Sequence, residues 1–143
     1  MNIDEKKDFV IFRMKEAKES YLDSILLLEN KSFRSSVNRA YYSMFYAVLA
    51  LANLSELSVS KHAGVIAFFD KEYIKTGIFT KEYSKYLHTA FELRQESDYL
   101  DFKDISLNDA EKAVKAAEKF LKTVFQHIQE KYSLFFPFSE NDQ

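Results

Sequence analysis

The stretch from Ala40 to Ala52 constrains the fold most, because Ser43 is its only polar residue. Two apolar stripes at helical spacing run along this region, one made of Val37, Tyr41, Met44, Val48 and Leu51 and the other of Tyr42, Phe45, Tyr46 and Leu49. A helix that is apolar on nearly all sides lies at the centre of its bundle or is covered by a second chain. The sequence therefore predicts a helical bundle built around this segment.

The composition also favours an all-α fold. Of the 143 residues, 47% are apolar, only two are glycine and one is proline, so long helices with short connections are expected. A chain of this length fits one domain, which we expect to span residues 1–143. Fourteen phenylalanines and nine tyrosines are many for one small core, and the surplus favours a homodimer or another protein interface.

Helical periodicity predicts five helices, four long and one shorter. Their approximate ranges are 6–29, 32–54, 60–77, 80–99 and 106–128. Ser32 and Thr80 are candidate N-caps, and Gly77 is a candidate left-handed residue at the end of the third helix. Ser106 and Asp109 form a candidate capping box for the fifth helix, whose apolar seam is the most regular in the chain. Its members are Leu107, Ala110, Val114, Ala117, Leu121, Val124 and Ile128.

Residues 132–143 are expected to form an aromatic C-terminal tail. Pro137 ends any helix there, and Phe135, Phe136 and Phe138 have no periodic partners. Because three exposed rings would promote aggregation, we expect them to dock on the bundle or across a dimer.

Charge and hydropathy indicate a cytoplasmic protein that does not span the membrane. No signal-peptide pattern follows the N-terminus, and no run reaches the ~20 apolar residues of a membrane helix. The net charge of −2 predicts no general attraction to nucleic acid, so any such binding needs a local basic patch. One candidate is a row of lysines on the fifth helix, Lys112, Lys115, Lys119 and Lys122, although such rows are more often solvated faces.

Two arginines inside apolar helical runs point to a polar pocket in the bundle, because a buried guanidinium needs a carboxylate or a ligand. The polar and ionisable groups nearest the predicted core are Arg39, Tyr42, Tyr46, His62, Arg94, Asp98 and Tyr99. One reading is a satisfied structural network, with Arg94 and Asp98 paired one turn apart. The other is a ligand site that holds phosphate on guanidinium donors and stacks a base on a ring.

His62 lies in the first turn of the third helix, where the helix dipole favours its neutral form and where it is a candidate base or a plain cap-region residue. His88 and His127 have no acidic or histidine partner at metal-ligand spacing, so we assign no metal and no cofactor. The sequence contains neither a glycine-rich phosphate loop nor a nucleophile elbow nor a paired-carboxylate signature.

The motifs RAYYSMF (39–45), SKHAG (60–64), KTGIF (75–79) and LRQESDY (93–99) make the chain resemble the HEPN domain family over about residues 5–130. The family name denotes a nucleotide-binding domain of higher eukaryotes and prokaryotes. The branch that it most resembles consists of small stand-alone proteins that are often paired with minimal nucleotidyltransferases. The resemblance implies an up-and-down helical bundle that dimerises.

Catalytically active HEPN proteins are metal-independent ribonucleases, and many are toxins. They carry an arginine followed, after four to six residues, by a histidine at the end of the fourth helix, and the pairs of two subunits form one site. Arg94 matches this arginine, but Tyr99 stands at the nearest histidine position. A tyrosine with a pKa of about 10 is a poor general base.

Three functions follow. The leading hypothesis is a homodimeric HEPN protein in a toxin–antitoxin-like pair that binds nucleotide, RNA or a nucleotidyltransferase around Arg39, Arg94 and Asp98. The second is an endoribonuclease toxin in which Arg94 neutralises the scissile phosphate and His62, or a residue of the other subunit, moves the proton. The third is a structural scaffold without a ligand.

Overall fold

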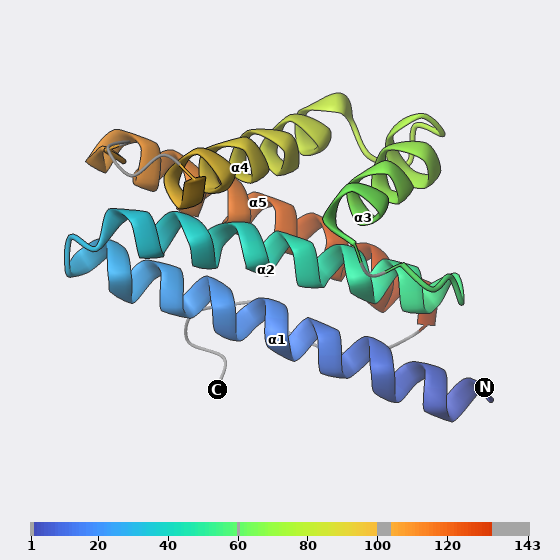
Figure 1. Ribbon diagram of the computed structural model, residues 1–143. Helices are drawn as coiled ribbons and strands as arrows, with labels where there is room; N and C mark the ends of the chain where they lie inside the picture. The colour runs from blue at the N-terminus through green and yellow to red at the C-terminus, as the bar shows by residue number, and fades with distance from the viewer. Residues whose placement is uncertain (1, 60, 100–103, 133–143) are drawn as a thin grey trace.

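The computed structural model describes residues 2–59, 61–99 and 104–132, apart from the side chains of Ile3 and of residues 97–99. Its elements are α1 (Ile3–Glu29), α2 (Phe33–Leu54), α3 (His62–Phe69), η1 (Asp70–Ile74), α4 (Lys81–Tyr99) and α5 (Leu107–Tyr132) (Figure 1). The all-α bundle of five helices, one of them shorter, is thus confirmed. None of the described helices is both long and apolar enough to cross a membrane.

The second helix is the centre of the fold. It packs against α1 along most of its length and also contacts α5, α4 and α3 (Figure 1). All five residues of its first apolar stripe have no exposed surface, from Val37 to Leu51. Of the two alternatives for this segment, the bundle centre is therefore the correct one, because neighbours from the same chain bury most of its circumference.

Local signals set several helix ends as expected. Ser106 Oγ accepts from the Asp109 backbone N–H at 3.1 Å, and an Asp109 carboxylate oxygen accepts from the Ser106 N–H at 3.2 Å, so the capping box is formed. Gly77 has φ +80°, as a left-handed residue after a helix requires. Ser32 lies at the N-cap of α2, but its side chain makes no capping hydrogen bond, so this part of the prediction was wrong.

Other boundaries differ from the sequence prediction. The first helix begins at Ile3 because the Asn2 side chain accepts from the backbone N–H of Glu5 at 2.9 Å. The third helix gives way to the π-helical turn η1, in which the N–H of Lys75 donates to the carbonyl of Asp70 at 2.8 Å. Leu107, expected in the seam of α5, is 50% exposed because it is the first residue of the helix.

The predicted tail falls largely outside the described residues. Tyr132, the first residue of the predicted tail, belongs to α5 and packs against the core. The docking of Phe135, Phe136 and Phe138 concerns residues beyond the described part of the chain and stays a prediction.

Candidate functional site

Eight side chains from three helices form an aromatic–arginine cluster on one side of the bundle. Its members are Arg39, Tyr41, Tyr42, Phe45 and Tyr46 of α2, His62 of α3, and Phe91 and Arg94 of α4. Residues one, three and four positions apart on α2 supply both the buried and the half-buried rings. The all-round apolar character of α2 therefore serves the core and the cluster together.

His62 is the centre of the cluster. Its Nδ1 lies 2.6 Å from the hydroxyl oxygen of Tyr41, which is fully buried. The Phe45 ring stacks on the imidazole with ring centroids 4.5 Å apart. The Tyr42 ring meets the imidazole edge to face, with ring centroids 5.8 Å apart. The ring of Phe91, on α4, also stacks on the imidazole, with ring centroids 6.2 Å apart. The imidazole is thus held by rings on several sides and by one hydrogen bond.

The two arginines meet over a single ring. The guanidinium carbon of Arg39 lies 5.0 Å from the centroid of Tyr42, and that of Arg94 lies 5.2 Å from the same centroid. Arg94 is also 5.6 Å from the ring of Tyr41. Such cation–π contacts contribute roughly 0.5–2 kcal/mol each. Nε and Nη2 of Arg39 donate to the side-chain oxygen of Asn38 at 3.2 and 3.0 Å. These two hydrogen bonds orient the guanidinium group of Arg39.

Burial and charge set the protonation states in the cluster. Burial lowers the pKa of His62, and the nearby charge of Arg94 lowers it further. Burial raises the pKa of Tyr41 far above its ordinary value. At neutral pH, His62 is therefore neutral and Tyr41 carries its proton. The expected direction for His62 is correct, but desolvation and Arg94 are the causes, whereas the sequence reasoning named the helix dipole.

The structure brings five of the predicted site residues together: Arg39, Tyr42, Tyr46, His62 and Arg94. The backbones of Asp98 and Tyr99 belong to the last turn of α4, but their side chains lie outside the described residues. The Arg94–Asp98 pair therefore stays a prediction.

Sequence reasoning missed three members of the cluster. The apolar stripes of α2 predict core positions for Tyr41 and Phe45, and the expected site residues do not include Phe91. A usable signal was present, because Phe91 precedes Arg94 by three residues and Phe45 follows Tyr41 by four.

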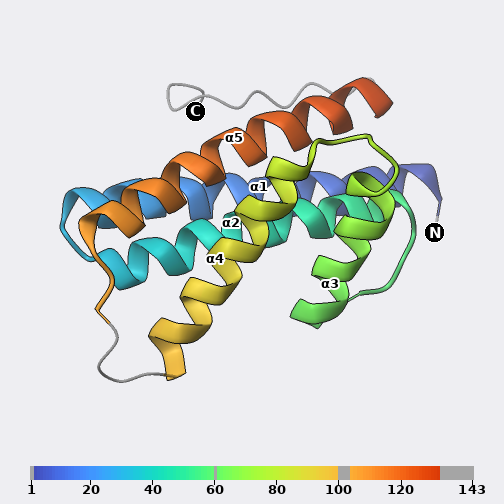
Figure 2. The same ribbon diagram turned by 90° about the horizontal axis from the view of Figure 1, so that it is seen from above.

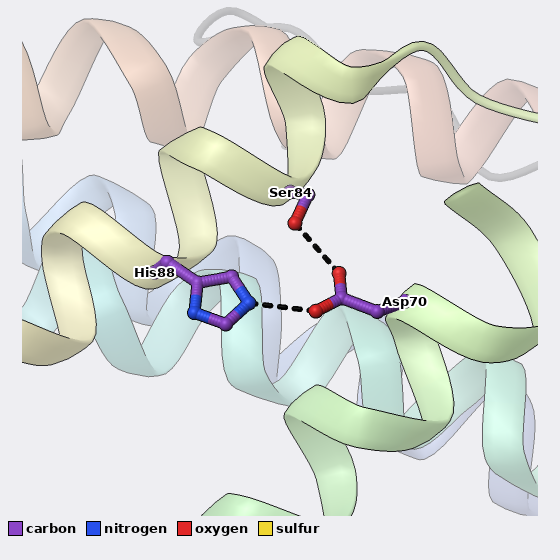
Figure 3. A network of polar contacts seen from close by, with 3 residues as sticks. All are labelled: Asp70, Ser84 and His88. Atoms are coloured by element: carbon purple, nitrogen blue, oxygen red, sulfur yellow. Dashed lines mark hydrogen bonds and ion pairs between the residues drawn. The ribbon is translucent and has the colours of Figure 1, made fainter. Parts of the chain in front are cut away.

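A second histidine cluster joins η1 to α4. Figure 3 shows Asp70 between two α4 side chains, with Nε2 of His88 at 2.7 Å from one carboxylate oxygen and the Ser84 hydroxyl donating to the other at 2.7 Å. Because the carboxylate lies between the serine and the histidine, the histidine cannot activate the serine as in a hydrolase triad. The side chains of His88 and Asp70 are 43% and 35% exposed. This cluster of Asp70, Ser84 and His88 therefore links η1 to α4, and we call it the interhelical tie.

Metal-ligating side chains do not converge in the described part of the chain. Residues 2–59, 61–99 and 104–132 contain no group of three His, Cys, Asp or Glu side chains placed to hold a metal ion. The chemistry that the aromatic–arginine cluster offers is that of guanidinium donors, aromatic faces and a neutral imidazole.

Comparison with known proteins gives a consistent result. A sequence model described as "HEPN domain" matches residues 10–130. A Thermotoga maritima protein named "UPF0332 protein" is 36% identical over 128 residues, which cover 90% of this chain and 97% of that protein. Two Methanocaldococcus jannaschii proteins named "Putative toxin MJ0142" and "Putative toxin MJ0605" are 33% and 32% identical. The aligned regions cover 80% of this chain in both cases, and 78% and 84% of those proteins.

Proposed function

The chain belongs to the HEPN domain family, and we propose that it is a toxin-like HEPN protein that binds nucleotide or RNA at the aromatic–arginine cluster. The names of two relatives support the toxin-like part of the proposal. The family does not define the ligand, so the geometry of the cluster has to support that part.

The observation that carries the proposal is the pair of guanidinium groups over Tyr42. Both guanidinium groups lie within 5.2 Å of the centre of one ring, which brings two sets of phosphate donors to the same place. Arginine forks match phosphate oxygens, and each base stacked on an aromatic side chain contributes ~1–3 kcal/mol. Tyr42 and Tyr46 are only half-buried, so their rings retain surface for a base.

A homodimer and a minimal nucleotidyltransferase partner, both in the cytoplasm, belong to the same proposal. Because neighbours from the same chain bury α2, its apolar surface no longer argues for a second chain. The exposed rings on α1 still do, since Phe9 and Phe12 are 48% and 53% exposed and lie three residues apart on one face. Light scattering should report twice the 16.8 kDa chain mass, and a persistent monomer at high micromolar concentration contradicts the dimer.

One observation favours ribonuclease activity as a second candidate. His62 is neutral, lies close enough to Arg94 for its pKa to respond, and contacts Tyr41. A neutral imidazole accepts the proton of an RNA 2′-hydroxyl as the 2′-oxygen bonds to phosphorus. The bond to the 5′-oxygen then breaks, water protonates that oxygen, and a cyclic phosphate remains. Arg94 would neutralise charge on the phosphoryl oxygens.

Induced expression and ligand-dependent melting separate the candidates. If the cluster binds nucleotide or RNA, ligand at 100 times its Kd stabilises the protein by about 2.7 kcal/mol, and Arg94→Ala abolishes this gain. A ribonuclease toxin would in addition arrest growth on induction, and both Arg94→Ala and His62→Ala would relieve the arrest. The control is Arg34→Ala, which removes an exposed guanidinium of α2 outside the cluster. A protein that shows no ligand-dependent melting and no toxicity is a structural scaffold.

A further inference from the structure

A groove lies between α4 and α5, away from the two histidine clusters. Its volume is about 820 Å³, and it exists because α4 crosses the bundle obliquely and packs more closely on α2 than on α5 (Figure 2). The lining residues come only from these two helices, at positions 82–93 of α4 and 109–119 of α5.

The floor of the groove is built from small aliphatic side chains. Ala90 and Leu93 of α4 face Ala113 and Ala116 of α5, and Tyr86 is the one aromatic residue of the lining. Small side chains let another backbone approach closely, as ridges of one helix fit the grooves of another. A single-stranded nucleic acid instead needs several aromatic platforms for its bases, which this floor does not offer.

The rim of the groove has unbalanced charges. Four exposed lysines line it, Lys85, Lys112, Lys115 and Lys119, and the charge of Lys115 acts on the Glu118 carboxylate. Three acidic side chains line it too, but each already accepts a hydrogen bond from its own chain. Glu82 accepts from Tyr86 at 3.2 Å, Asp109 from the Ser106 N–H at 3.2 Å and Glu118 from Tyr21 at 2.9 Å. With four lysines against three carboxylates, the rim carries a net positive charge, which favours an acidic partner.

We propose that this groove is the docking surface for an acidic amphipathic α-helix of a partner protein. The apolar side chains of that helix would fill the floor between Ala90 and Ala116, and its carboxylates would flank them and meet the lysine rim. This use of the lysine row differs from the phosphate tracking considered from the sequence. It does not depend on nucleotide or RNA binding at the aromatic–arginine cluster.

The test uses two synthetic helical peptides of about 20 residues that share one leucine stripe and differ only in flanking glutamate or lysine. Each is titrated into the full-length ¹⁵N-labelled protein. The glutamate peptide is expected to shift the backbone amide resonances of Ala113 and Ala116 and to bind at least tenfold more tightly than the lysine peptide. Its affinity is expected to fall at least tenfold for the variant that combines Lys112→Glu and Lys115→Glu. Lys71→Glu, a single reversal of the same kind on an exposed lysine of η1, is expected to leave its affinity unchanged, whereas Lys112→Glu alone is expected to weaken it.

Several results overturn the proposal. Equal affinities of the two peptides, or amide shifts that map outside α4 and α5, show that the groove does not select an acidic helix. A single-stranded RNA oligonucleotide that displaces the glutamate peptide makes the groove a nucleic-acid site. Groove amides that shift with protein concentration alone make it an interface between copies of this chain. A circular dichroism spectrum identical to wild type shows that the charge-reversed variant is folded.

Discussion

His62 and His88 are both half-buried histidines with one short hydrogen bond, yet their surroundings are opposite. His62 is enclosed by rings, contacts the phenol of Tyr41 at 2.6 Å and is close enough to Arg94 for that charge to lower its pKa. His88 contacts the carboxylate of Asp70 at 2.7 Å, and Ser84 satisfies the second carboxylate oxygen. One site brings two guanidinium groups to aromatic faces, whereas the other joins a histidine to a carboxylate.

The difference indicates which histidine serves a ligand. His88 has a carboxylate partner, Asp70, on the neighbouring element, so this contact stabilises the packing of η1 on α4. A neutral histidine that is surrounded by rings and lies near Arg94 offers the environment in which we expect an anionic, planar molecule to bind. We therefore propose ligand binding for the aromatic–arginine cluster and a structural role for the Asp70 cluster.

Removing Tyr41 should have the largest effect on stability. Its side chain has no exposed surface and contacts the rings of Tyr42, Phe45 and Phe91. We expect Tyr41→Ala to lower the free energy of unfolding by ~3–5 kcal/mol, as for other large buried aromatic residues. Urea denaturation measures this change, and a loss below 1 kcal/mol would mean that the cluster is not part of the core.

Replacing Arg94 should affect ligand binding rather than stability. We expect Arg94→Ala to weaken nucleotide or RNA affinity at least tenfold, ~1.4 kcal/mol, while the melting temperature changes little or rises. Fluorescence anisotropy and thermal melting provide the two measurements.

The competing interpretation of Arg94 is the core ion pair with Asp98. In that case Arg94→Ala costs ~3–5 kcal/mol of stability, because it strands a carboxylate, and replacing both residues recovers much of the loss. That pattern with unchanged ligand affinity would return Arg94 to a structural role.

The pH dependence of stability should test the environment of the His62 imidazole. Because the pKa of His62 is lowered in the folded protein, the unfolded chain takes up the proton more readily, and stability falls as the pH drops below about 6.5. His62→Gln should reduce the fall in melting temperature between pH 7 and pH 5. Burial also lowers the pKa of His127, so His62→Gln should keep part of the fall in melting temperature. His127→Gln is the matched variant that measures this remaining part. An unchanged slope in His62→Gln contradicts the assignment.

The smallest effect is expected at the interhelical tie. Asp70→Asn weakens two contacts that are partly exposed, so we expect a loss of ~0.2–1 kcal/mol and no change in nucleotide or RNA affinity. Glu111→Gln, the same change at an exposed position of α5, is the control. A tenfold loss of ligand affinity in Asp70→Asn would show that the two clusters are coupled.

The sequence predicts the fold well because most of its signals are local. The Ser106–Asp109 capping box, the left-handed Gly77 and the seam of α5 from Ala110 to Ile128 each depend on residues within one helix or turn. The apolar run in α2 likewise indicates the bundle centre without knowledge of its neighbours.

The candidate site is less accessible to sequence reasoning. That Arg39 and Arg94 share the ring of Tyr42 depends on how α4 crosses α2, which periodicity does not define. Asp70 and His88 are 18 residues apart and lie on different elements, so their contact depends on how η1 packs against α4. His88 therefore looked like an unpartnered edge residue.

The most direct test of the ligand-site assignment observes both histidines in one experiment. Full-length protein is titrated with AMP and with a short single-stranded RNA while the imidazole resonances are followed by NMR. We predict that the resonances of His62 shift and saturate, that those of His88 stay in place, and that Arg94→Ala abolishes the His62 response. Shifts confined to His88, or no response of His62 to either ligand at millimolar concentration, would contradict the assignment of the aromatic–arginine cluster as the ligand site.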